Sequence, residues 1–269
     1  RKGLIMTYYT LSDKGLVRAN NEDYTESLGI TWCNHEGKEI ELTALILADG
    51  MGGAAAGEFA SSLAVNSIRQ NIVNNIFARS PENFLETDRT EFLEEYIQSA
   101  NSAVYEKATA NAEMKGMGTT IVTGIVYRNS MALAHVGDSR AYKFANNKMT
   151  RITSDHSLVQ EFINAGQLSD EEAFDHPQRN IITRALGMNM SVKVDKKNIP
   201  LNYGDIIMFC SDGLCGYARD NEIEEVFAQY YRQENTDLKE LARKMIELAC
   251  KNGGGDNISV SFYQHLKKF

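Results

Sequence analysis

The chain has 269 residues, of which 43% are hydrophobic and 24% are charged, a composition typical of a folded protein with a sizeable core. A net charge of -8 and a pI near 5.3 argue against a large surface for nucleic acid backbones. No apolar run approaches the roughly 20 residues that cross a bilayer, and the first residues lack the pattern of a secretory signal. We therefore expect a cytoplasmic protein that binds no nucleic acid and does not insert into a membrane.

The four cysteines show neither CxxC spacing nor a regular framework. Their spacing favours buried, reduced thiols over a zinc site or a set of disulfides. The cysteines are Cys33, Cys210, Cys215 and Cys250.

Six apolar runs predict β-strands. In chain order they cover residues 4–10, 42–48, 119–127, 130–136, 205–210 and 258–263. The sequence YRNS between the third and fourth runs predicts a hairpin connection. The last run alternates, with Ile258, Val260 and Phe262 on one face and serines on the other.

Apolar residues at helical spacing predict three helices, at 60–72, 90–111 and 237–250. Thr236 or Asn235 is expected to cap the last helix, and Gly253 follows its end. Because strands arrive in neighbouring pairs, antiparallel sheets with helices outside are favoured, an α+β arrangement. No linker or internal repeat divides the chain, so a single domain over residues 1–269 is predicted.

Three aspartates stand where apolar runs meet glycine-rich segments: Asp49 in LADGMGG, Asp212 in CSDGL and Asp256 in GGGDN. Carboxylates at strand ends can converge when the sheet forms, and gathered oxygen ligands suit hard cations such as Mg²⁺ or Mn²⁺. The glycine-rich segment 48–61 has neither the GKS/T ending nor the GxGxxG spacing of a nucleotide-binding loop. Metal binding is therefore the favoured interpretation.

Two further segments carry charged candidates, each with a simpler alternative. Arg18 precedes Glu22 and Asp23; its guanidinium could grip a phosphoryl group, or form a local ion pair in a surface turn. Asp138, in GDSR, could join the metal site, or pair locally with Arg140 in a β-turn.

Taken together, these motifs match a known family. The segments RxxNED, LADGMGG, MGTT, HVGDSRAY, TSDHSLV, HPQRNIITRALG, SDGL and GGGDN lie in order between residues 15 and 263. The chain thus resembles the bacterial PPM-type (type 2C) protein phosphatases, metal-dependent enzymes that act on phosphoserine and phosphothreonine. The resemblance implies a central β-sandwich of two antiparallel sheets flanked by helices on both faces.

The resemblance also implies roles for individual residues of the metal site. By analogy, Asp49 bridges two metal ions, the Gly50 carbonyl binds one of them, and Asp212 and Asp256 hold the other. Asp138 would hold, together with Asp212, a third and weaker ion found in bacterial members.

Further expectations concern the remaining charged residues and the reaction. Glu22 and Asp23 match acids that act on the metals directly or through water, and Arg18 matches the arginine that grips the phosphate. The implied reaction is hydrolysis of the phosphate ester by a metal-activated water, with two Mn²⁺ or Mg²⁺ ions at the core site.

The segment 154–187 matches the family's flap beside the active site, and Ser169 and Glu172 predict a capping box within it. His156 and His176 are candidate proton donors to the leaving group, the alternative being a structural role.

The sequence departs from the family pattern at three places. Ala54 stands where bacterial relatives usually carry a histidine, and Met51 takes the position of a proposed acid histidine of the eukaryotic branch. Residues 77–95 form a longer helix connection than the motifs require, and we assign it no role.

We expect phosphorylated proteins as substrates, a membrane-anchored serine/threonine kinase as the opposing enzyme, and a monomer. One alternative is a catalytically silent binding module, although the aspartates whose loss would mark it are all present. The other is a phosphatase of an anti-sigma-factor antagonist; such relatives usually lack the arginine, so Arg18 disfavours it.

Overall fold

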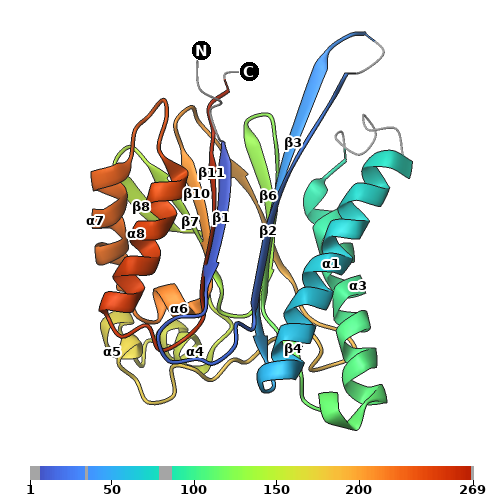
Figure 1. Ribbon diagram of the computed structural model, residues 1–269, viewed down its shortest axis with the longest axis vertical. Coiled ribbons are helices and arrows are strands. Elements are labelled where there is room, and N and C mark those ends of the chain that lie inside the picture. Colours follow the sequence, from blue (N-terminus) through green and yellow to red (C-terminus); the bar gives the residue numbers. More distant parts are fainter. Residues whose placement is uncertain (1–6, 34–35, 79–86, 268–269) are drawn as a thin grey trace.

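Two antiparallel β-sheets face each other, and helices cover the outer face of each sheet (Figure 1). This computed structural model describes residues 7–33, 36–78 and 87–267. The first sheet has the strand order β1 (Tyr8–Asp13), β11 (Ile258–Gln264), β10 (Ile206–Cys210), β7 (Arg140–Ala145), β8 (Lys148–Arg151). The second has the order β2 (Asp23–Cys33), β3 (Glu39–Met51), β5 (Ile121–Tyr127), β6 (Ser130–Val136), β9 (Asp195–Pro200), and β4 (Gly118–Thr119) pairs with β3.

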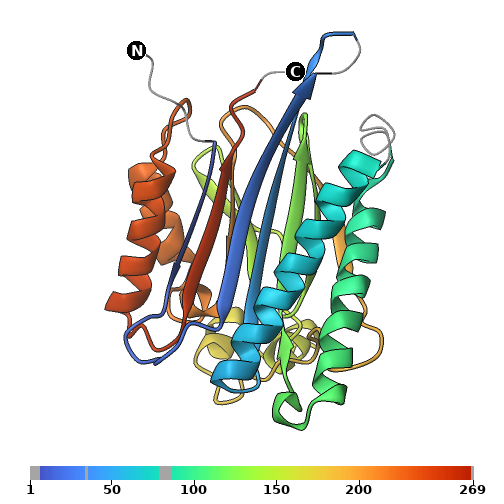
Figure 2. The same ribbon diagram turned by 45° about the vertical axis from the view of Figure 1, so that its right-hand side comes forward.

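The helices lie in two pairs with shorter helices near one end of the sheets. The long helices α1 (Ala54–Ala78) and α3 (Arg89–Ala110) run side by side over the second sheet (Figure 2). On the opposite side, α7 (Asp220–Tyr230) and α8 (Leu238–Lys251) cover the first sheet (Figure 1). The short elements are η1 (Ala112–Met114), α4 (Leu158–Asn164), α5 (Asp170–Phe174) and α6 (Asp212–Cys215). The predicted arrangement of two antiparallel sheets with helices on both faces is confirmed.

Three apolar layers hold these elements together. One lies between the second sheet and α1 and α3, another between the first sheet and the C-terminal helices, and the third between the sheets. Successive side chains of β11 point alternately to the two faces of the first sheet. Val260 and Phe262 pack toward the helices, whereas the Ser261 hydroxyl lies 2.8 Å from the Thr10 hydroxyl and 2.7 Å from the Thr25 hydroxyl of the other sheet.

The six predicted strands and three predicted helices all have counterparts, with shifted ends. Residues 4–6 of the first predicted strand lie outside the described residues. The hairpin prediction is confirmed, because Tyr127 and Ser130 are paired residues and Arg128 adopts a positive φ of 50°. The flap's capping box is also confirmed, since Ser169 and Glu172 exchange the expected hydrogen bonds.

The predicted cap of α8 was wrong. Asp237 caps the helix, because its Oδ1 accepts the Glu240 N–H at 3.0 Å. Thr236 is buried, and its hydroxyl already donates to the Arg232 carbonyl at 2.8 Å. The hydroxyl therefore closes the turn after α7 and is not available to α8.

The antiparallel pairing decides where the chain's motifs meet. The ends of β3, β6 and β10 lie at the same edge of the sandwich as the starts of β2, β7 and β11. Four motifs distant in sequence are thereby brought to one edge, beside the short helices α4, α5 and α6 (Figure 1). Among the described residues, no helix is both long enough and apolar enough to cross a bilayer.

We expect Phe209→Ala to lower the unfolding free energy by about 3–5 kcal/mol, because the ring is fully buried between the sheets and its loss leaves a cavity. Urea denaturation measures the change. The matched control is Phe59→Ala, at a ring 37% exposed, which should cost less than about 1 kcal/mol. Equal losses for the two variants would contradict the assignment of Phe209 to a tightly packed layer.

Candidate metal centre

Two aspartates lie directly opposite each other at the start of β2 and near the end of β3. Asp23 and Asp49 are register partners in the antiparallel pair. Like charges in opposing positions destabilise a sheet, so this pair requires a proton or a cation nearby. Asp23 is 8% exposed, and its Oδ2 accepts the Ser211 hydroxyl at 2.7 Å.

The other sheet contributes acids to the same place. Asp212 begins α6 directly after β10, and Asp256 stands just before β11. Burial raises the pKa of Asp49 well above its ordinary value, and the charges of Asp23, Asp212 and Asp138 raise it further. The fold thus brings together four aspartates predicted from motifs far apart in the sequence.

The raised pKa values of these carboxyl groups show how strongly burial and mutual repulsion disfavour their negative charges. Burial raises the pKa of Asp23 to about 8, against the hydrogen bonds from serine that favour ionisation. Burial, followed by the charge of Asp256, raises the pKa of Asp212 to about 6. For Asp138, burial and then the charge of Asp212 raise the pKa well above its ordinary value. A cluster of this kind stabilises a cation placed among its oxygens.

Residues of the MGTT motif fix the backbone of Asp49. The Thr119 hydroxyl donates to the Asp49 carbonyl at 2.8 Å, and the Thr120 hydroxyl accepts the Asp49 N–H at 3.0 Å. The Thr120 hydroxyl also lies 2.7 Å from that of Ser139, next to Asp138. This motif therefore both starts a strand and positions the aspartate.

Glycines leave the room that Glu22 occupies. A Cβ on Gly57 would lie 2.0 Å from Glu22 Oε2, and one on Gly50 would lie 2.7 Å from the Glu22 carbonyl oxygen. The Glu22 N–H donates to Asn257 Oδ1 at 2.8 Å, and burial raises the pKa of the Glu22 carboxyl. Glu22 is thus held beside Gly50, at the edge of the cluster.

Arg18 forms an ion pair with Asp256, not with its sequence neighbours. Its Nη2 lies 2.7 Å from Asp256 Oδ2, and its side chain is 49% exposed. The local ion pair considered as the alternative is therefore wrong for this segment. The arginine instead lies next to the predicted metal ligands, with part of its guanidinium open to solvent.

Asp138 and Arg140 do not form the local pair considered from the sequence either. Arg140 donates Nε and Nη2 to Asp155 and lies 3.6 Å from Asp220. Asp138 is 7% exposed, and its Oδ1 has no hydrogen-bond partner within the described residues. An uncompensated buried carboxylate oxygen is the kind of atom that a metal ion satisfies.

Residues that sequence reasoning did not single out hold the candidates in position. Asn257 accepts the Glu22 N–H and donates to the carbonyls of Lys14 and Asn20. Ser211 binds both Asp23 and the Ser259 N–H. Ser211 lies in the motif SDGL and Asn257 in the motif GGGDN. The motifs therefore identified these two segments but not the positioning roles of these two side chains.

A separate group, His135, His156 and Asp195, places its ligand atoms within 4.8 Å of one another. His156 Nδ1 accepts the Gly137 N–H at 3.0 Å, so the neutral ring carries its proton on Nε2, facing Asp195. That tautomer leaves no lone pair on Nε2 for a metal. Burial lowers the pKa of His156 to about 4, which makes the ring a poor proton donor near neutral pH.

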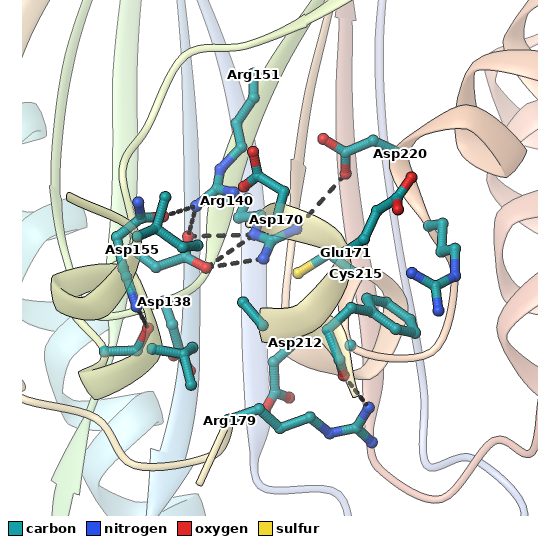
Figure 3. A pocket seen from close by; sticks show the side chains of 18 of the residues that line it. Asp138, Arg140, Arg151, Asp155, Asp170, Glu171, Arg179, Asp212, Cys215 and Asp220 are labelled. Atoms are coloured by element: carbon teal, nitrogen blue, oxygen red, sulfur yellow. Dashed lines mark hydrogen bonds and ion pairs between the residues drawn. The ribbon is translucent and has the colours of Figure 1, made fainter. Parts of the chain in front are cut away.

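Next to the acidic cluster lies a cavity of about 900 Å³ (Figure 3). Asp138 and Asp212 line one part of it, and residues of α4, α5, α6 and the start of α7 form much of the remainder. The predicted flap segment 154–187 thus forms a wall of a cavity that reaches the acidic cluster.

The donor set fits hard divalent cations. The candidate ligands are carboxylate and carbonyl oxygens, which magnesium and manganese prefer, and the Asp138 Oδ1 atom is buried without a partner. Met51 takes the position of the proposed acid histidine named in the sequence analysis. Its side chain is partly exposed at the end of β3.

Comparisons with known proteins agree with this geometry. A family model described as Protein phosphatase 2C matches residues 18–247. The serine/threonine phosphatase stp of Listeria welshimeri is 34% identical over 93% of this chain and 92% of its own length. A crystal structure of the Mycobacterium tuberculosis serine/threonine phosphatase PstP/Ppp superposes with a TM-score of 0.81 at 32% identity, covering 98% of this chain and all of the other. A structure of the catalytic domain of a serine/threonine protein phosphatase PstP in complex with two manganese ions has a TM-score of 0.76 at 31% identity, over 97% of this chain and 98% of that one.

The raised pKa of Asp23 predicts a pH effect on the metal-free protein. Because the folded-state pKa rises from 3.8 to about 8, the contribution of this group to stability is full below pH 4 and is lost as the pH rises toward 8. In chelator, Asp23→Asn should therefore gain unfolding free energy relative to wild type between pH 5 and pH 8. Urea denaturation measures this difference, with Glu95→Gln on the exposed face of α3 as control. A pH-independent difference would contradict it.

Proposed function

This chain belongs to the protein phosphatase 2C family, and we propose that it is a metal-dependent phosphatase of phosphoserine and phosphothreonine in proteins. The observation that carries the proposal is the convergence of Asp23, Asp49, Asp138 and Asp212 at one edge of the sandwich, where each carboxyl has a raised pKa. Cations among these oxygens would remove the charge repulsion and create a hydrolytic centre.

The proposed ligand set follows the positions of the acids. Asp49 would bridge two Mn²⁺ or Mg²⁺ ions, with the Gly50 carbonyl on one ion and Asp212 and Asp256 on the other. The relative in complex with two manganese ions supports this number. When bound, the ions supply Lewis acidity: they lower the pKa of water and offset charge on the phosphoryl oxygens.

The remaining acids would complete the centre. Glu22 and Asp23 would act on the ions directly or through water, and Asp138 would join Asp212 around a third ion. The partnerless Oδ1 of Asp138 supports this assignment.

Arg18 would bind the phosphoryl group of the substrate. Its ion pair with Asp256 holds the guanidinium at the cluster, and 49% of the Arg18 side chain is exposed to solvent. A planar guanidinium can donate two parallel hydrogen bonds to phosphoryl oxygens. In this assignment Arg18 orients the ester and offsets its charge, while the Asn257 side chain keeps the loop that carries the arginine on the sheet edge.

The biological setting is inferred from the family. Substrates are phosphorylated proteins, and the names of the relatives support this class. We further propose that the protein acts as a monomer in the cytoplasm and opposes a membrane-anchored serine/threonine kinase.

Asp212→Asn should lower kcat for a small aryl phosphate by about 100-fold or more, because a ligand shared by the proposed ions loses its charge. A steady-state assay with manganese measures the loss, and Glu95→Gln serves as the control. Chelator should abolish wild-type activity. A folded wild-type protein that stays inactive with every divalent cation would instead favour the catalytically silent binding module.

Arg18→Ala should raise KM by about 10-fold or more, because it removes charge-assisted hydrogen bonds to the phosphoryl group. Arg18→Lys should recover only part of the loss, since a lysine lacks the planar pair of donors. Steady-state kinetics of the three proteins provide the measurement. A KM unchanged in Arg18→Ala would remove phosphate binding from the role of this residue.

A further inference from the structure

His156 is a buried side chain that the proposed reaction does not use. It is 4% exposed and lies near the start of the flap segment 154–187. Its ring stacks on that of His135, with a centroid distance of 4.7 Å and an interplanar angle of 16°. The Nε2 proton of the neutral ring prevents metal binding at that atom. Because buried polar groups are kept where they have hydrogen-bond partners, the partners of this ring indicate its role.

The ring and the backbone of His156 both bind the residue that precedes Asp138. The Gly137 N–H donates to His156 Nδ1 at 3.0 Å, and the His156 N–H donates to the Gly137 carbonyl at 3.0 Å. These two hydrogen bonds hold the peptide groups on either side of Gly137. The second of these groups leads directly into Asp138, so His156 helps to fix where the Asp138 side chain begins.

Gly137 also lies in close contact with Thr120. Its φ is 107°, and a Cβ placed on it would lie 2.6 Å from the Thr120 Cβ. The Thr120 hydroxyl lies 2.7 Å from the hydroxyl of Ser139, the residue after Asp138. The turn that carries Asp138 is therefore held by two residues from other parts of the chain, Thr120 of the MGTT motif and His156 of the flap.

His156 lies where the two ends of the flap segment meet. Its carbonyl accepts the Thr183 N–H at 2.8 Å, and the next residue, Ser157, forms a β-bridge with Ile182. The chain thus enters the flap at His156 and leaves it beside the same residue. His156 therefore joins the base of the flap to the turn of Asp138.

The other nitrogen of the His156 ring is also placed by its surroundings. His156 Nε2 lies 3.4 Å from Asp195 Oδ2, and Asp195 Oδ1 accepts Arg184 Nη1 at 2.9 Å. Asp195 is in turn the register partner of His135 in the pair of β6 and β9. The carboxylate and the stacked ring together favour the orientation in which Nδ1 points to Gly137.

We propose that His156 is a positioning residue for Asp138, and that its Nδ1 hydrogen bond sets the affinity of the ion shared by Asp138 and Asp212. The proposal rests on the proposed function, specifically on the third ion assigned there to Asp138. Asp138 Oδ1 is buried without a hydrogen-bond partner within the described residues, so a displaced turn would change how this oxygen faces a cation. His156 would thereby link binding of that ion to the base of the flap.

The test separates the two ring nitrogens by means of two amide side chains. In His156→Asn, the amide oxygen takes the place of Nδ1 and can still accept the Gly137 N–H. In His156→Gln, the amide group instead reaches the position of Nε2 beside Asp195, and the Gly137 N–H loses its acceptor. Both variants lose the stack on His135, so stacking cannot explain a difference between them.

Calorimetric titration of the metal-free proteins with Mn²⁺ measures the binding steps. His156→Gln should weaken the weakest of three steps by about 10-fold, because a buried N–H is left without its acceptor, and should leave the two tighter steps unchanged. His156→Asn should keep all three steps close to those of the wild type. The matched control is His176→Gln: His176 Nδ1 accepts the Gln178 N–H at 3.1 Å, a bond of the same kind inside the flap segment, and its loss should leave Mn²⁺ binding unchanged.

Hydrogen exchange of the metal-free proteins provides a second readout. The Gly137 amide should exchange about 10-fold faster in His156→Gln than in His156→Asn, because only the asparagine supplies an acceptor. The amides of β6 should exchange at equal rates in the two variants. Faster exchange throughout β6 in His156→Gln would instead indicate general destabilisation and would contradict a positioning role.

Equal Mn²⁺ affinities of His156→Asn and His156→Gln at the weakest step would overturn the proposal, whether both are weakened or neither is. A wild type that binds fewer than three Mn²⁺ ions would overturn it as well. Hydrolysis of an aryl phosphate by the same preparations tests the proposed function separately. An active wild type whose two variants bind Mn²⁺ alike would keep the function and sink the inference. An inactive wild type with the expected difference between the variants would sink the function and support the inference.

Discussion

The repulsion among carboxylates at one edge of the sandwich is the constraint around which this structure is organised. Asp23 and Asp49 oppose each other across two strands, and Asp212 comes from the facing sheet. An assembly of this kind opposes folding unless protons or cations neutralise its charge. Hydroxyl groups hold the aspartates in place, with Ser211 on Asp23 and the two MGTT threonines on the backbone of Asp49.

The sequence predicted well the strands whose pattern of apolar residues reflects burial on one or both faces of a sheet. The strands at 130–136 and 258–263 were located almost to the residue, because their apolar side chains fill the layers on either side of each sheet. Strands β2, β7, β8 and β9 were not predicted. Strands β2, β8 and β9 lie at sheet edges and carry many exposed or half-buried polar residues, so their hydrophobic pattern is weak. Strand β7 is short, and the charged residues Arg140 and Lys143 interrupt its apolar pattern.

The candidate site could be predicted as a set of residues but not as a geometry. Motif order and family resemblance identified the aspartates, and the fold brings four of them into electrostatic reach. The partners of the charged residues could not be predicted in this way. Arg18 binds Asp256, which is 238 residues away, and Arg140 binds Asp155. Such pairs depend on tertiary folding, whereas sequence reasoning favours the nearest opposite charge.

The side chain of Asn257 has one more consequence. Its amide accepts the Glu22 N–H and donates to the carbonyls of Lys14 and Asn20, on either side of Arg18. The arginine loop and the first acid of β2 are thereby fixed to one point at the start of β11. Because these hydrogen bonds join residues at least 235 positions apart, this part of the site depends on long-range contacts, the kind that slow the folding of a domain.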